Sequence, residues 1–110
     1  MEKVYNRRNR VYGYVDNNII YDRDYNIAGY TDGRVLYDSR YKPLAYLGNG
    51  YVYDMRGTPL GYYKGYDLYD SKGTYLGYGN YGFRGLLGAA LLFLALGSVF
   101  GRGYGYYGYY

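Results

Sequence analysis

Short apolar stretches alternate with polar ones along the first 84 residues, and their spacing is regular. An aliphatic residue recurs every sixteen positions, and a tyrosine directly follows each one. This aliphatic column consists of Val4, Ile20, Leu36, Val52 and Leu68. Because successive side chains of a strand point to opposite faces, the aliphatic column is predicted to point inward, into a core.

Two tyrosine columns define the repeat. The first holds Tyr5, Tyr21, Tyr37, Tyr53 and Tyr69, and the second, nine residues later, holds Tyr14, Tyr30, Tyr46, Tyr62 and Tyr78. The residues that follow the first column are polar: Asn6, Asp22, Asp38, Asp54 and Asp70. The residues that precede the second column are small: Gly13, Gly29, Ala45, Gly61 and Gly77. Repetition in register indicates an internal repeat array over residues 3–84.

Each unit contains two turn signals. The sequences DMRG (54–57) and DSKG (70–73) favour a type I turn, in which the aspartate bonds to its own backbone and glycine takes a positive φ. The second set of turns is predicted at Asn17-Asn18, Asp32-Gly33, Asn49-Gly50 and Lys64-Gly65. The predicted fold class is therefore mainly β: an antiparallel meander of about five sixteen-residue hairpins, followed by one apolar C-terminal α-helix.

The return strand of each hairpin carries a leucine two residues before its tyrosine in three units, at Leu44, Leu60 and Leu76. Alternation predicts that leucine and tyrosine share a face, with glycine between them facing the opposite way. A strand glycine leaves a slot in which a ring can lie flat, so we expect tyrosine to cover glycine. Two closures fit the repeat: a rosette of hairpins around an axis, or an extended ribbon.

The units VYDMRGTPLGYYKG (52–65) and LYDSRYKPLAYLGNG (36–50) resemble bacterial four-fold β-flower proteins, whose short hairpins surround a central axis. The resemblance covers roughly residues 19–80. It implies a fold and carries no catalytic residues. A fifth, degenerate unit at 3–18 and the apolar C-terminal extension depart from the four-fold pattern.

No charged residue lies between Arg84 and Arg102. A helix over 86–100 would be about 23 Å long, shorter than the ~30 Å hydrocarbon core of a bilayer. Such a helix is apolar on every side and must be buried. We do not expect the hairpin array to surround it completely. Three environments remain open: the array's open face, a cluster of identical helices in an oligomer or filament, and a bilayer.

The predicted organisation is a hairpin-repeat domain (1–84), an apolar helix (85–101) and a Gly/Tyr-rich tail (102–110). The candidate assembly or membrane residues are Leu86, Leu87, Leu91, Leu92, Phe93, Leu94, Phe100, Tyr104, Tyr106 and Tyr107.

The composition excludes several kinds of chemistry. Cysteine and histidine are absent, so no thiolate site and no Ser-His-Asp arrangement can form. We expect no catalytic residues, no metal and no cofactor. Aspartates in a closed ring could bind Ca²⁺, although turn formation already explains their spacing. The net charge of +4 is mild, and aspartates interrupt the tyrosines, so we expect no nucleic-acid partner.

The leading hypothesis is a non-catalytic structural protein that self-assembles through the helix and tail, as a filament or envelope-layer subunit. The alternatives are a module that binds carbohydrate or protein through its tyrosine surfaces, and a surface protein anchored in a membrane by its C-terminus. The N-terminus MEKVYNRRNR has no apolar signal-peptide region. An extracellular or envelope location is still the one that a structural role favours.

Overall fold

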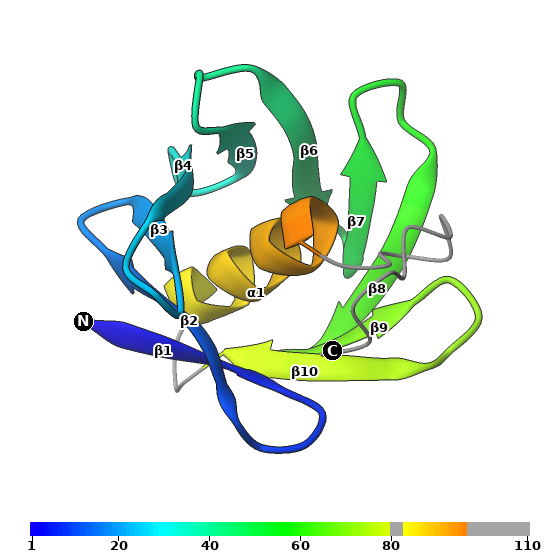
Figure 1. Cartoon of the computed structure of the whole chain (residues 1–110). Helices are drawn as coiled ribbons and strands as arrows, with labels where there is room; N and C mark the ends of the chain where they lie inside the picture. The colour runs from blue at the N-terminus through cyan, green and yellow to red at the C-terminus, as the bar shows by residue number, and fades with distance from the viewer. Residues whose placement is uncertain (80–82, 97–110) are drawn as a thin grey trace.

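The hairpins form a closed ring of strands around a helix (Figure 1). A computed structural model describes residues 1–79 and 83–96, with the helix side chains described over 85–92. The strands are β1 (Glu2–Asn6), β2 (Val11–Asp16), β3 (Ile19–Asp22), β4 (Ile27–Thr31), β5 (Val35–Asp38), β6 (Pro43–Gly48), β7 (Tyr51–Asp54), β8 (Pro59–Lys64), β9 (Asp67–Asp70) and β10 (Tyr75–Gly79). The helix is α1 (Phe83–Leu96).

The sheet is a ten-strand antiparallel barrel in which each strand pairs with its sequence neighbours. Pairing of β1 with β10 closes it, through Tyr5 opposite Tyr78. This confirms the predicted meander of five hairpins and decides the closure in favour of the rosette. The first hairpin, β1–β2, is paired on both sides in the barrel, as the other four hairpins are.

The helix lies inside the barrel (Figure 1). Every described helix side chain that can contribute to the core is buried, and Leu86, Leu87, Leu91 and Leu92 are completely inaccessible. The expectation that the array could not surround the helix is therefore wrong. Its physical reason is the fifth hairpin, which enlarges the ring enough to admit a helix. The helix begins at Phe83, before the 85 or 86 expected from the sequence.

The aliphatic column lines the barrel interior, as predicted. All five of its members, Val4, Ile20, Leu36, Val52 and Leu68, have no exposed surface. Full burial of one such side chain stabilises the fold by roughly 1.5–3 kcal/mol. The column and the helix leucines belong to one continuous hydrophobic core.

The small-residue column also faces the interior, and this overturns the expectation that tyrosine covers glycine. A methyl group on Gly13 would lie 2.4 Å from Leu92 Cδ1, and one on Gly29 would lie 2.4 Å from Leu91 Cδ2. These glycines therefore leave space for the helix leucines. Ala45 occupies the same repeat position and is fully buried.

The leucines of the return strands join the core instead of sharing the outer face with tyrosine. Leu76 is fully buried and Leu60 nearly so, and Leu44 packs against them. The cause is a β-bulge at the same place in every hairpin, for example between Val52 and Tyr53. A bulge places two residues opposite one and interrupts the alternation of faces.

The turns between hairpins have two forms. Asn17-Asn18 and Asn49-Gly50 take positive φ at both positions, as type I′ requires. In the other two turns the cross-strand pairing, Lys64 with Asp67 for example, places the central residues at 33–34 and 65–66, one position later than predicted. The glycine comes first there, and it alone has a positive φ, which matches type II′.

Two contacts fix the start of the helix. Glu2 Oε1 accepts a hydrogen bond of 3.0 Å from the backbone N–H of Gly85. A carboxylate at a helix N-terminus satisfies an unpaired donor and complements the helix dipole. The strand β10 and the helix also meet backbone to backbone, because a methyl group on Gly79 would lie 2.3 Å from the Leu86 nitrogen.

We therefore expect Gly79→Ala to lower the free energy of unfolding by about 1–3 kcal/mol, because the added methyl group meets backbone that cannot move away. The matched control is Gly48→Ala, whose methyl group would meet only the Arg34 guanidinium at 3.7 Å. That variant is expected to stay within about 0.5 kcal/mol of the parent. Urea denaturation followed by circular dichroism measures both. Equal stability of the two variants would contradict the close contact between β10 and α1.

Candidate functional site

The outer face of the barrel carries the two tyrosine columns, which form a continuous belt. Members of the two columns lie directly opposite each other in neighbouring strands, for example Tyr62 and Tyr69. Their rings stack, with centroids 5.0 Å apart for this pair, 5.1 Å for Tyr46–Tyr53 and 4.9 Å for Tyr5–Tyr78. The tyrosine side chains of the belt are all half-buried.

The second column also reaches the tip of the following hairpin, eleven residues farther along the chain. Tyr14 stacks on Tyr25 at 4.5 Å, and Tyr30 stacks on Tyr41 at 4.1 Å. The last member, Tyr78, donates a hydrogen bond to Asn9 Oδ1 in the first hairpin. The contact between a second-column tyrosine and the next hairpin tip therefore continues from the last hairpin to the first.

In two hairpins the tip position that the second-column tyrosine of the preceding hairpin approaches is a glycine. A methyl group on Gly57 would lie 3.8 Å from the Tyr46 hydroxyl, and one on Gly73 would lie 3.4 Å from the Tyr62 hydroxyl. The five equivalent tip positions all take a positive φ. They are Asn9, Tyr25, Tyr41, Gly57 and Gly73. Glycine adopts this conformation without strain, whereas tyrosine does not.

The repeated aspartates make the hairpin tips. The Oδ1 atom of Asp38 accepts hydrogen bonds from the backbone N–H groups of Arg40 (2.8 Å) and Lys42 (2.9 Å). The same pair of bonds occurs at Asp22, Asp54 and Asp70, and Asn6 makes it in the first hairpin. The Lys42 bond is the main cause that lowers the pKa of Asp38. Among residues 1–79 and 83–96, no three His, Cys, Asp or Glu side chains gather as a metal site would need.

Hydrogen bonding and burial also raise the pKa of several tyrosines of the belt. A hydrogen bond with Tyr25 is the main cause that raises the pKa of Tyr14, whereas desolvation is the main cause for Tyr30. Tyr37 donates a hydrogen bond of 3.0 Å to Asp32 Oδ2, which raises the pKa of Tyr37. These shifts favour the protonated phenols of Tyr14, Tyr30 and Tyr37, which therefore present neutral rings and hydroxyl groups at physiological pH.

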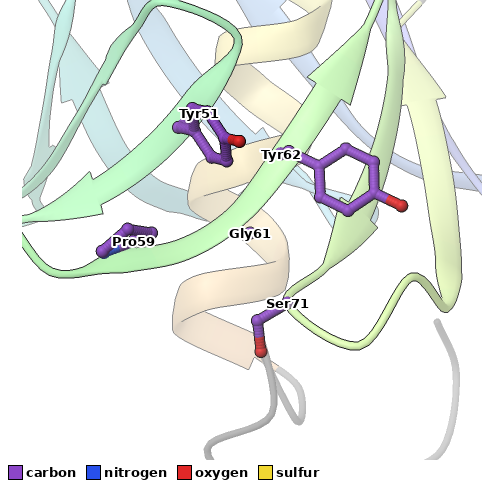
Figure 2. A pocket seen from close by; sticks show the side chains of 5 residues that line it. All are labelled: Tyr51, Pro59, Gly61, Tyr62 and Ser71. Atoms are coloured by element: carbon purple, nitrogen blue, oxygen red, sulfur yellow. The ribbon is translucent and has the colours of Figure 1, made fainter.

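A shallow pocket of about 120 Å³ opens on the outer face at the fourth hairpin. Figure 2 shows Pro59, Gly61 and Tyr62 along β8, with Tyr51 of β7 on one side and Ser71 on the other. None of the five lining residues is charged. Tyr51 is 45% exposed and stands in the edge of the pocket.

The pocket depends on departures from the repeat. One hairpin earlier, the residues equivalent to Tyr51 and Ser71 are Val35 and Met55. Tyr51 supplies a wall that valine would not, and the small Ser71 leaves space that methionine would fill. The sequence analysis missed both residues because it followed the conserved columns of the repeat. The signal that could have found Tyr51 is that no other hairpin has a tyrosine at this repeat position, whereas Ser71 has an equivalent in Ser39.

The remaining sequence-predicted residues have different fates. Gly61 lines the pocket, and it is buried like Gly29 and Gly77 of the same column. Leu86, Leu87, Leu91 and Leu92, which were proposed for assembly or membrane contact, lie in the core. The side chains of Phe93 and Leu94, and all of Phe100, Tyr104, Tyr106 and Tyr107, lie outside the described residues. Within the described part of the chain, no helix is long and apolar enough to cross a membrane.

A family model described as "5-fold beta-flower protein" matches residues 1–95. The chain belongs to the 5-fold β-flower family. The resemblance to four-fold β-flower proteins over 19–80 thus had the right kind of fold and the wrong number of repeats. The first hairpin and most of the helix, which looked like departures, lie within the family match. No curated protein and no solved structure matches the chain.

Tyr75, whose ring lies 5.5 Å from that of Tyr69 in the belt, should lose its proton only at high pH. Burial raises the pKa of Tyr75 to about 12, with the charge of Asp67 adding to the effect. Because the β-flower binds this proton more tightly than the unfolded chain, the contribution of Tyr75 to stability is complete below its ordinary pKa near 10. It is lost as pH rises from there to about 12.

The measurement is the tyrosinate absorbance of the parent protein minus that of Tyr75→Phe, as a function of pH. We expect the difference to titrate near 12 in the folded protein and near 10 in concentrated urea. A difference that titrates near 10 in both conditions would contradict the burial of this phenol.

Proposed function

We propose that this β-flower is a non-catalytic binding module that holds a neutral ring of a glycan on its outer tyrosine belt, at the pocket beside Tyr51. The observation that carries the proposal is a local break in five-fold symmetry: Tyr51 and Gly61 of the fourth hairpin and Ser71 in the turn of the fifth line an open, uncharged pocket. The fold itself requires neither Tyr51 nor Ser71, since other hairpins close with different residues at these positions.

The chemistry of the pocket suits a pyranose ring. Aromatic rings bury the apolar C–H face of a sugar while their hydroxyl groups remain available to its polar edge. Tyr51 and Tyr62 supply such rings, and Ser71 supplies a hydroxyl that both donates and accepts hydrogen bonds. The absence of charged side chains in the lining favours a neutral sugar over an acidic one.

The pocket is small compared with the roughly 300–1,000 Å³ of typical ligand sites. One sugar ring is therefore the largest group that we expect it to hold, and the affinity for a single ring is expected to be weak. A polysaccharide could bind more tightly by contacting further tyrosines of the belt, because linked contacts raise the effective concentration.

Tyr51→Val and Ser71→Met test this proposal, since each installs the residue of the preceding hairpin. A glycan array followed by NMR titration of the best neutral oligosaccharide would measure binding. We expect each variant to weaken binding about tenfold, close to the energy of one aromatic contact. The control is Tyr66→Asn, which introduces the residue found at position 18 and removes an exposed tyrosine outside the pocket lining. No binding of the parent protein to any neutral glycan would refute the proposal.

Self-assembly is the second candidate, and it now depends on the outer tyrosines and the tail. Burial of Leu86 and its neighbours leaves those leucines without a role at an interface. The Gly/Tyr composition of residues 102–110 is typical of segments that associate through stacking and backbone hydrogen bonds. Light scattering can compare the full chain with a version ending at Gly101, which keeps the helix. Large particles formed by the full chain and not by the shortened version would support a filament or layer. If both proteins are monomeric, self-assembly is refuted.

A further inference from the structure

The four aspartate turns and the equivalent turn at Asn6 lie at one end of the barrel. In a meander the connections alternate between the two ends, so the turns that follow β1, β3, β5, β7 and β9 are together. We call this set of turns the tip ring; it consists of residues 6–10, 22–26, 38–42, 54–58 and 70–74. Figure 1 shows these hairpin tips spread around the central helix.

The helix runs toward the tip ring. It starts beside Gly79, at the opposite end of the barrel. One turn later Gly88 contacts Val15, and farther along Leu92 contacts Gly13, which is closer to the tip of its hairpin. The negative end of the helix dipole therefore faces the tip ring, where cations are favourable.

The tip ring holds most of the basic residues of the chain. Eight of the 13 Lys and Arg residues lie in it, against five of the nine acidic residues. The eight are Arg7, Arg8, Arg10, Arg23, Arg40, Lys42, Arg56 and Lys72, and all are exposed. The turns at the opposite end, the strand ends beside them and the start of the helix carry Lys3, Arg34, Lys64 and Arg84 against Glu2, Asp16, Asp32 and Asp67. The tip ring is thus positive, whereas the charges of these residues at the other end balance.

The tip ring also exposes large apolar side chains. Tyr41 is 64% exposed, Tyr25 58% and Met55 49%. Tyr25 and Tyr41 hold a positive φ of 66° and 65°. The fold accepts glycine at this position, as Gly57 and Gly73 demonstrate. A strained tyrosine kept where glycine would serve is typical of a functional surface.

We propose that the tip ring binds the surface of a bilayer rich in anionic lipid. Basic side chains are attracted to anionic headgroups, and tyrosine is favoured at the boundary between headgroups and acyl chains. The apolar Met55 and the tyrosine rings would enter that boundary, whereas a soluble polyanion offers them no apolar partner. The ring is broad enough for a flat surface, since the molecule measures 29 × 28 × 26 Å.

Co-sedimentation of the full chain with vesicles tests this proposal. The vesicles are equal parts of phosphatidylglycerol and phosphatidylcholine, with pure phosphatidylcholine vesicles for comparison. We expect binding to the mixed vesicles alone, and loss of binding at about 1 M salt, where the Debye length falls to roughly 3 Å.

Matched variants distinguish binding through the tip ring from attraction that depends on the net charge of the protein. Arg40→Asp introduces the residue found at position 24, and Lys64→Asp introduces the residue found at positions 16 and 32. Both change the net charge equally, at opposite ends of the barrel. We expect Arg40→Asp to weaken vesicle binding about tenfold and Lys64→Asp to change it less than about twofold. Tyr41→Gly, which installs the residue of position 57, should weaken vesicle binding, while the relief of backbone strain offsets the lost stacking on Tyr30.

Three results would overturn the proposal. The first is equal weakening by Arg40→Asp and Lys64→Asp, which would indicate attraction by net charge alone. The second is equal binding to both kinds of vesicle. The third is binding to soluble polyphosphate that depends on Arg40 while the vesicles remain unbound, which would make the partner a soluble polyanion. None of these results depends on glycan binding at Tyr51, so the two proposals can fail separately.

Discussion

The structure depends on a mutual requirement between the barrel and the helix. A barrel of about eight strands is just narrow enough for its own side chains to fill, and a ten-strand barrel is wider. The inward side chains here are short or medium in size, and one position in each repeat is glycine or alanine. They cannot fill the interior, and the apolar helix cannot remain in water. Each element therefore supplies what the other lacks, and the helix is the centre of the core.

Glycine residues allow the barrel strands and the helix to approach each other closely. Gly13 and Gly29 on the strands leave space for helix leucines, and Gly88 on the helix leaves space for valines of the first hairpin. At Gly79 the backbones themselves touch. Interiors are packed about as densely as organic crystals, so a single methyl group matters at such contacts. Glu2, the sole glutamate, then ties the first strand to the start of the helix.

Much of this fold could be predicted from the sequence, because its strongest signals are local. The sixteen-residue spacing, the aspartate turns and the column that contains Val4 and Val52 each report on one hairpin. Two features could not be predicted. The bulge that turns Leu60 toward the core breaks the alternation of faces on which the prediction relied, and the space that admits Leu91 depends on the closed ring as a whole. The pocket at Tyr51 was missed because it is a departure from the repeat.

In a repeat protein, positions at which one hairpin differs from the others indicate where a residue serves something besides the fold. Residues common to all five hairpins close the barrel and hold the helix. Residues confined to one or two, such as Tyr41, Tyr51 and Ser71, are free to serve a partner. The chain also supplies its own controls, because the residue found at the same position of another hairpin is already compatible with the fold. The pocket on the side of the barrel and the tip ring at its end share only Ser71 among these positions.

Hydrogen exchange measured by NMR on the full chain tests most directly whether the helix is the core of the barrel. The account predicts that the backbone amides of residues 86–92 exchange only through global unfolding, with the same free energy as the amide of Val52 in the barrel wall. Fast exchange of the helix amides while Val52 stays protected would show that the barrel stands without the helix, and would contradict the account.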